Sequence, residues 1–212
     1  MDGLFVCGVT EKASGDICQW QTKDITYAIT GYIPQFSQDQ YRSAVRRAFD
    51  AWEAVCGIHA NEVTSTDANI MLSVGRGRRN NFDGPSGVLA WCEIPCGNVR
   101  QCQLRMDLDE TWTDKVSDAG IFVDAVLAHE LGHGIGIYHI DSGTALMNPI
   151  YNKSVSKPLA LDIAQGTLRY GEARPRTPQP PVTPPVTPPV TPPTGKTVKA
   201  ILYTDGTWVN AA

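Results

Sequence analysis

The chain has 212 residues, of which 19% are charged and 42% are hydrophobic, and its net charge is −4 at pH 7. This length fits one domain of about 150 residues with an appendage. The weak negative charge excludes a basic protein that binds nucleic acid or anionic membranes through charge. No apolar stretch approaches the ~20 residues that a membrane span needs.

The first half of the chain carries patterns of strands and of one helix. Alternating apolar residues predict a half-buried strand over residues 24–30. Ser37 and Gln40 form a capping box, which predicts a helix that begins there and that Gly57 closes. Further strands are expected over residues 68–74, 87–94 and 101–108.

The second half adds two helices and a tail. Residues 118–134 and 159–169 are expected to be helical, which makes an α+β arrangement of about five strands and three helices. Ten of the chain's 15 prolines then fall between Pro175 and Pro193, and this composition predicts a semi-rigid polyproline spacer. Residues 196–212 follow as strand, turn and strand, a hairpin that is marginal alone.

One short segment carries the chemistry, because it reads H-E-x-x-H-x-x-G-x-x-H from His129 to His139. On a helix, His129 and His133 lie one turn apart on the same face, with Glu130 beside them. Gly136 allows the chain to turn and bring His139 to the same metal ion. Three imidazoles leave a fourth position for water, which is the open arrangement of a catalytic zinc.

The same residues predict a hydrolytic reaction. Zinc lowers the pKa of its bound water to about 7, and Glu130 is placed to accept the proton as general base. The alternative is that H-E-x-x-H occurs by chance on a buried helix. Two observations argue against chance. Three of the chain's four histidines lie in the motif, and A-L-M-N-P at residues 145–149 adds a methionine-containing turn.

These motifs resemble the matrixin branch of the metzincin zinc peptidases. F-D-G-P-S-G-V-L-A at residues 82–90 and D-L-D-E-T-W-T at residues 107–113 are similar to segments of that family. The resemblance implies a metzincin catalytic domain with a mixed, twisted sheet. Together with the composition of the tail, it divides the chain into an N-terminal segment (1–19), a peptidase domain (20–172), a Pro/Thr-rich linker (173–195) and a hairpin-like end (196–212).

The resemblance also implies sites around the zinc. Asp83, Asp107 and Glu110 match carboxylates that hold calcium, a cation that prefers oxygen ligands. The alternative is that they are ordinary turn and capping acids. Met147 is expected to lie beneath the zinc without binding it.

Substrate binding is expected along an edge strand and in a pocket beside the zinc. The strand would pair with an extended substrate backbone, and an apolar pocket wall would select a hydrophobic P1′ residue. The residues expected to contribute are Val88, Leu89, Ala90, Leu127, Pro149, Ile150 and Tyr151.

The chain departs from the family at a second, structural zinc. Trp91 and Arg105 stand where two of its histidine ligands would be, and residues 76–81 contain no histidine. We therefore expect that second zinc to be absent. A disulfide from one of the three cysteines between residues 92 and 102 is expected to fasten this region instead.

The six cysteines, an even number, indicate disulfides in an exported protein. No secretory signal follows Met1, so we expect either its removal or another route of export. C-G-V at residues 7–9 is similar to the matrixin propeptide segment whose cysteine occupies the zinc's open position. Two interpretations stay open: Cys7 is a latency switch, or it forms a disulfide, for which Cys18 is a convenient partner.

The leading prediction is a secreted zinc endopeptidase that cleaves proteins or peptides. The alternative is a latent or non-catalytic binding protein of the same fold, whose Pro-rich tail attaches to a partner. The intact histidines and Glu130 favour the enzyme.

Overall fold

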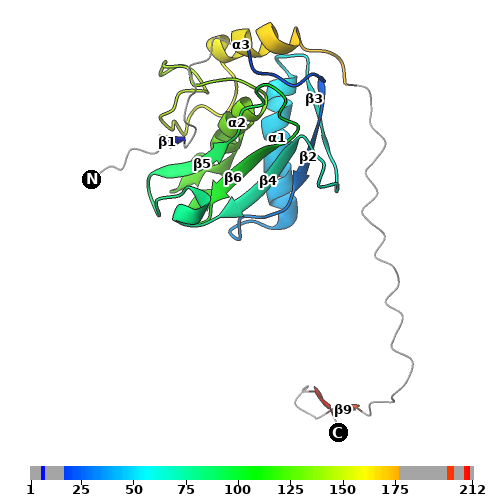
Figure 1. The fold of residues 1–212 in the computed structure, drawn as a ribbon. Coiled ribbons are helices and arrows are strands. Elements are labelled where there is room, and N and C mark those ends of the chain that lie inside the picture. Colours follow the sequence, from blue (N-terminus) through cyan, green and yellow to red (C-terminus); the bar gives the residue numbers. More distant parts are fainter. Residues whose placement is uncertain (1–5, 8–16, 177–199, 203–207, 211–212) are drawn as a thin grey trace. The chain divides into compact units, whose positions relative to one another are not determined.

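The computed structural model describes residues 6–7, 17–176, 200–202 and 208–210. The chain divides into two compact units, Met1–Arg176 and Thr177–Ala212. The first unit contains the histidine motif and a mixed α+β fold, as predicted (Figure 1).

A six-stranded sheet forms the frame of the first unit (Figure 1). β5 and β6 are antiparallel, and all other neighbouring strands are parallel. Across the sheet the order is β1 (Val6–Cys7), β5 (Val88–Cys92), β6 (Cys102–Asp107), β4 (Ile70–Gly75), β2 (Asp24–Ile29) and β3 (His59–Glu62). β2, β4, β5 and β6 were predicted within two residues at each end, whereas the short β3 was not.

Helix α1 (Gln38–Glu53) begins at the predicted capping box, in which Ser37 and Gln40 bond each other's backbone N–H groups. The prediction that Gly57 closes this helix is wrong, because the helix ends four residues earlier. Gly57 is required for another reason. A Cβ there would lie 2.5 Å from the carbonyl oxygen of Tyr170, so the glycine allows the C-terminal chain to pass.

Helix α2 (Val123–Gly134) is shorter than predicted. Residues 118–120 are not helical, and β8 (Ile121–Phe122) pairs instead with β7 (Trp112–Thr113). The cause lies at Gly120, whose φ of +112° is incompatible with a helix. Helix α2 packs beside α1 on one face of the sheet, and α3 (Ala160–Tyr170) lies across the end of the pair (Figure 1).

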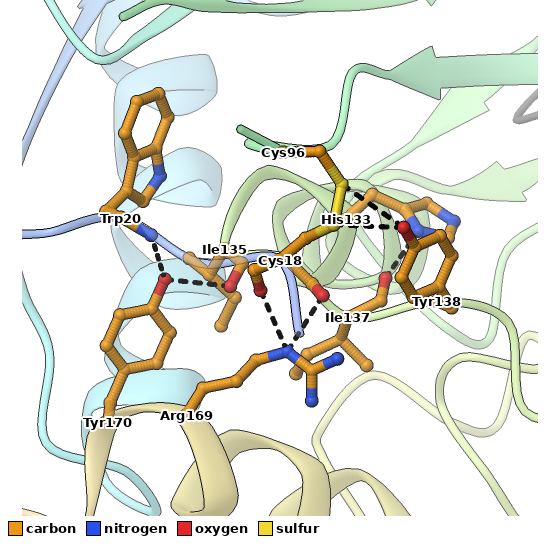
Figure 2. Close-up of a disulfide and its surroundings, with 10 residues drawn as sticks. Cys18, Trp20, Cys96, His133, Ile135, Ile137, Tyr138, Arg169 and Tyr170 are labelled. Atoms are coloured by element: carbon orange, nitrogen blue, oxygen red, sulfur yellow. Dashed lines mark hydrogen bonds between the residues drawn. A yellow bond between two sulfur atoms is a disulfide. The ribbon is translucent and has the colours of Figure 1, made fainter. Parts of the chain in front are cut away.

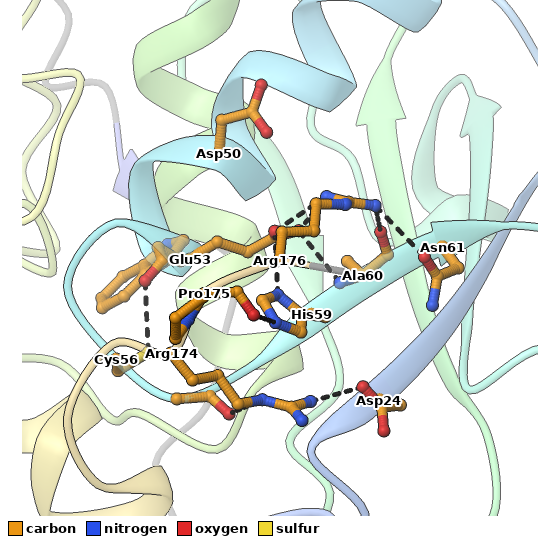
Figure 3. A network of polar contacts seen from close by, with 12 residues as sticks. Asp24, Asp50, Glu53, Cys56, His59, Ala60, Asn61, Arg174, Pro175 and Arg176 are labelled. Atoms are coloured by element: carbon orange, nitrogen blue, oxygen red, sulfur yellow. Dashed lines mark hydrogen bonds and ion pairs between the residues drawn. The ribbon is translucent and has the colours of Figure 1, made fainter. Parts of the chain in front are cut away.

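A polar network fastens the end of the first unit to α1 and β3 (Figure 3). Arg176 Nη1 donates to both carboxylate oxygens of Glu53, at 2.9 and 2.8 Å. Arg46 also pairs with Glu53, and His59 lies between Glu53 and the Pro175 carbonyl oxygen. Residues 174–176 are therefore part of the folded unit.

In the second unit, β9 (Ala200–Leu202) and β10 (Trp208–Asn210) pair antiparallel. The predicted spacer from residue 177 onward lies outside the described residues. Within the described part of the chain, no helix combines the length and apolar character needed to cross a membrane.

Candidate metal centre

The three histidines of the motif converge on one point. His129 and His133 lie one turn apart on α2, and His139 follows in the loop after the helix. One ligand atom from each, together with the Cys7 sulfur, lies within 4.8 Å of the others. Among the residues that the structure describes, this is the one group of three or more His, Cys, Asp or Glu side chains with such spacing.

Hydrogen bonds set the tautomer of two rings. His129 Nδ1 lies 2.8 Å from the Leu146 carbonyl oxygen, and His133 Nδ1 lies 2.7 Å from that of Ile137. A carbonyl oxygen can only accept, so each Nδ1 carries the proton and each Nε2 keeps its lone pair. Both Nε2 atoms are buried and lack a hydrogen-bond partner within the described residues. A zinc ion at the cluster would satisfy them, so these residues fit the metal.

Burial keeps these imidazoles neutral. It lowers the pKa of His129 to about 4, although the bond to the Leu146 carbonyl acts in the other direction. Burial and the two neighbouring imidazoles lower the pKa of His133 well below its ordinary value. Metal binding requires the neutral ring, so both side chains are already in the binding form.

Glu130 is buried beside the histidines, with 1% of its surface exposed. Burial raises its pKa to about 8, while a hydrogen bond with Cys7 acts to lower it. Its Oε2 atom has no hydrogen-bond partner among the described residues. The side chain lines the same cavity as His129, so its carboxyl group borders the space beside the metal position.

Gly136 makes the turn after α2 that the sequence predicted. Its φ is +95°, and a Cβ there would lie 2.0 Å from the Cys18 carbonyl oxygen. Glycine is the residue that suits both this conformation and this close approach. The turn brings His139 back towards the other two histidines.

The methionine-containing turn at residues 145–149, called the Met-turn below, lies under α2. Met147 is fully buried, and a Cβ on Gly132 of α2 would lie 2.3 Å from its sulfur. The buried carboxylate of Asp162 holds this turn by accepting the backbone N–H groups of Leu146 and Met147, at 2.7 and 3.0 Å. Sequence reasoning placed Asp162 only in the last helix and missed this role. An acid in the first turn of a helix ordinarily suggests a capping residue. Asp162 has this role as well, because it accepts the Leu159 N–H.

The N-terminal strand β1 lies between β5 and Pro149, beside these residues. It pairs parallel with β5, with Val6 opposite Val88 and Cys7 opposite Ala90. On its other side, Cys7 N–H donates to the Pro149 carbonyl oxygen at 3.2 Å. The suggested disulfide between Cys7 and Cys18 is wrong, because Cys18 is bonded to Cys96.

A small cavity of about 30 Å³ opens beside Glu130 and His129. Of the residues predicted to bind substrate, Leu89, Pro149, Ile150 and Tyr151 line it. Leu127 is instead fully buried in the hydrophobic core, and Val88 and Ala90 contribute backbone on β5 rather than cavity lining. The apolar lining that the sequence did not reveal comes from Ala125, Val126, Ala145, Leu146 and Val155.

The three acids matched to calcium lie around the loop before β5. Asp83 Oδ1 accepts the Val88 N–H at 3.0 Å, and Glu110 Oε1 accepts the Ser86 N–H at 2.7 Å. Asp107 is fully buried, and its Oδ2 has no hydrogen-bond partner in the described part of the chain. Burial first, and then neighbouring carboxylates, raise the pKa values of Asp107 and Glu110. The three acids therefore form one acidic group, in which the charge of Arg76 offsets only part of the rise in the pKa of Asp107.

Trp91 and Arg105 contact each other where the family has structural-zinc ligands. The Arg105 guanidinium lies 5.3 Å from the centre of the Trp91 ring. Both side chains donate to Asn80, Arg105 to its Oδ1 and Trp91 to its carbonyl oxygen, each at 2.8 Å. This group ties the loop at residues 76–81 to β5 and β6. The disulfide expected in the region of residues 92–102 is present. It joins Cys96 to Cys18, which lies far outside that region.

Comparison with known proteins agrees with this geometry. A family model described as Matrixin matches residues 19–166. The chain is 35% identical to stromelysin-1 of Mus musculus over 139 residues, which are 64% of this chain and 28% of that protein. It is 34% identical to stromelysin-3 of Rattus norvegicus and 35% identical to interstitial collagenase of Bos taurus, each over 168 residues, or 76% of this chain.

The matched region covers 34% of the rat protein and 35% of the bovine protein, so the chain spans about a third of the length of these relatives. The family model, by contrast, covers well over half of this chain, including all three histidines and Glu130. The chain belongs to the matrixin family of zinc metallopeptidases.

Proposed function

We propose that this protein is a zinc-dependent endopeptidase with His129, His133 and His139 as zinc ligands. The observation that carries this proposal is the convergence of these three side chains beside a buried Glu130. Zinc held there would supply a water of lowered pKa and would polarise the scissile carbonyl. The positive charge of that zinc would favour the ionised form of Glu130 despite its burial. Glu130 is then the general base in this proposal: it accepts the water's proton and passes it to the leaving amine.

Substrate binds along the edge strand β5 in this proposal. The pairing of β1 with β5 supports it, because an extended backbone already fits between β5 and the Pro149 carbonyl. Such pairing reads backbone rather than side chains, so selectivity falls to the adjoining cavity. Its lining by Leu89, Val126 and Tyr151 favours a hydrophobic P1′ residue.

Cys7 serves as a latency switch in the form of the protein described here. Its sulfur lies in the same cluster as the three histidines, which is where a fourth zinc ligand would be. The strand that carries it also covers the edge on which substrate would bind. Both contacts oppose catalysis until β1 leaves, so the latent enzyme is favoured over a non-catalytic binding protein. A partner for the Pro-rich tail stays a prediction.

Calcium stabilises the loop of Asp83, Asp107 and Glu110 in this proposal. The buried Asp107 Oδ2 and the mutual repulsion of the acids support it, since a cation would relieve both.

We further propose export, because the Cys18–Cys96 disulfide suits an oxidising compartment.

The decisive experiment measures the cleavage of an unfolded substrate protein by this chain, once β1 no longer covers β5. The cleavage rate is compared with and without a zinc chelator. We expect chelator-sensitive cleavage. Glu130→Ala should keep its zinc but lose about 3 kcal/mol or more of transition-state stabilisation, the scale for a general base. His133→Ala should lose the zinc itself. Cleavage that survives the chelator, or a Glu130→Ala variant with unchanged turnover, would refute the assignment.

A further inference from the structure

The third zinc ligand is carried by irregular chain. Residues 135–141, all of which the structure describes, form neither helix nor strand. The backbone from the end of α2 to His139 is nevertheless held, because four successive carbonyl oxygens each accept a hydrogen bond from a side chain. These bonds run from Trp20 Nε1 to Gly134 (2.8 Å), from Tyr170 Oη to Ile135 (2.9 Å), from Arg169 Nε to Gly136 (2.8 Å) and from His133 Nδ1 to Ile137 (2.7 Å). Figure 2 shows the bonds to Ile135, Gly136 and Ile137.

The segment at residues 18–20 lies directly against this turn. Arg169 Nε donates to the Cys18 carbonyl oxygen at 3.1 Å as well as to Gly136. The Tyr170 hydroxyl accepts the Trp20 N–H at 3.0 Å while it donates to Ile135. The N-terminal segment and the end of α3 therefore hold the turn together (Figure 2).

A disulfide anchors the same segment. It joins Cys18 to Cys96, which lies between β5 and β6, and it links positions 78 residues apart. The Tyr138 hydroxyl lies 3.0 Å from the Cys18 sulfur and 3.2 Å from the Cys96 sulfur. Disulfide sulfurs carry no proton, so Tyr138 is the donor. The disulfide thus contacts the residue that immediately precedes His139 (Figure 2).

We propose that Tyr138 and the Cys18–Cys96 disulfide position His139 as the third zinc ligand. The other two ligands stand on α2, whose backbone hydrogen bonds already fix where their side chains begin. His139 stands on a loop, and a loop that is ordered before the metal arrives loses less conformational freedom on binding. This inference rests on the zinc site of the proposed function and assigns its third ligand a specific support.

The test compares the full chain with Tyr138→Phe and with the double variant Cys18→Ser/Cys96→Ser. Zinc affinity is measured by competition with a chelator, under conditions where circular dichroism shows each form folded. The visible spectrum of Co²⁺ bound in place of zinc reports the ligand geometry. We expect both variants to bind zinc about tenfold more weakly, the lower end of the loss when a group that orients a ligand is removed, and to alter the Co²⁺ spectrum.

Tyr32→Phe is the matched control, because Tyr32 is also half-buried and packs against Tyr41 on α1 rather than near the zinc. It should leave zinc affinity and the Co²⁺ spectrum as in the parent. The proposal is overturned if Tyr138→Phe behaves in the same way. The disulfide would then be a crosslink only, even if its loss lowers the melting temperature. Should the double variant not fold, Tyr138→Phe alone decides.

His139→Ala separates this inference from the proposed function. Unchanged zinc affinity in His139→Ala would show that the zinc site itself is misassigned. Lost affinity in His139→Ala with parental affinity in Tyr138→Phe would remove only the positioning role.

Discussion

The carboxylate of Asp162 accepts the backbone N–H of Met147 at 3.0 Å and so joins α3 to the Met-turn. Its other oxygen accepts the Leu146 N–H at 2.7 Å, and the Leu146 carbonyl in turn accepts the Nδ1–H of His129. The Leu146 carbonyl and the Met147 N–H belong to one peptide unit, so this unit connects the buried acid to the ring of His129, a proposed zinc ligand. The Met-turn contributes to the orientation of His129 as well as to the packing beneath it.

Asp162→Asn should weaken this connection. Asparagine offers one acceptor oxygen where the carboxylate uses both, so at least one buried N–H group loses its partner. We expect about 2 kcal/mol less free energy of unfolding, within the range for a buried hydrogen bond to a charged group. Urea denaturation measures this. Asp141→Asn, at an exposed acid just after His139, is the control, and equal stability of both variants would contradict the role.

Removal of the Cys7 thiol should activate the enzyme. Cys7→Ala removes the sulfur from the histidine cluster, so only the short pairing with β5 still holds β1 over the proposed substrate edge and β1 leaves more readily. A tethered ligand acts at an effective concentration of about millimolar, so we expect the initial rate of peptide cleavage to rise about tenfold or more. Cys56→Ala, at a buried cysteine after α1, should leave that rate unchanged. A Cys7→Ala rate equal to the parent's would remove the switch.

The network around Glu53 should make stability depend on pH in the acid range (Figure 3). Burial by itself raises the pKa of Glu53, but the Ala60 N–H, Arg46 and Arg176 outweigh it, and the net pKa is lowered. A lowered folded-state pKa contributes stability above the unfolded value of about 4.3, and this contribution is lost as pH falls through the folded value.

Glu53→Gln should therefore flatten part of the decline in unfolding free energy below about pH 4.3.

Truncation of the chain tests how much residues 173–176 contribute to stability. A chain that ends at residue 176 should retain the parent's stability, whereas one that ends at residue 172 loses Arg174 and Arg176 and should melt at a lower temperature. Identical melting temperatures of the two truncated chains would show that Arg174 and Arg176 add nothing to stability.

Calcium should raise the melting temperature of the full chain. Saturation at about 100 times the dissociation constant corresponds to ~2.7 kcal/mol of stabilisation. Asp107→Asn should abolish most of this gain, because Asp107 is the most deeply buried member of the acidic group. Asp67→Asn, at an exposed acid, should retain it. A calcium effect of equal size in both variants would place the ion elsewhere.

Local patterns in the sequence predicted much of the fold. The capping box at Ser37 begins α1 as expected, because its two hydrogen bonds join residues three apart. The spacing of His129 and His133 follows from helix geometry alone. The predicted helix bounds were wrong at two glycines. Gly57 accommodates the passing chain at Tyr170 rather than capping a helix, and Gly120 ends the helical pattern before α2.

The sequence by itself predicted the proposed zinc ligands, the proposed general base Glu130 and the turn at Gly136, because all of these depend on residues within eleven positions of one another. Only the tertiary structure decided that Cys18 bonds to Cys96, that Asp162 holds the Met-turn and that Tyr138 contacts the disulfide. The disulfide and the Tyr138 contact join residues 78 and 120 positions apart, and the Asp162 contact joins α3 to a turn 15 residues earlier. Their partners are selected by packing of the whole domain, and six cysteines alone allow about 15 pairings.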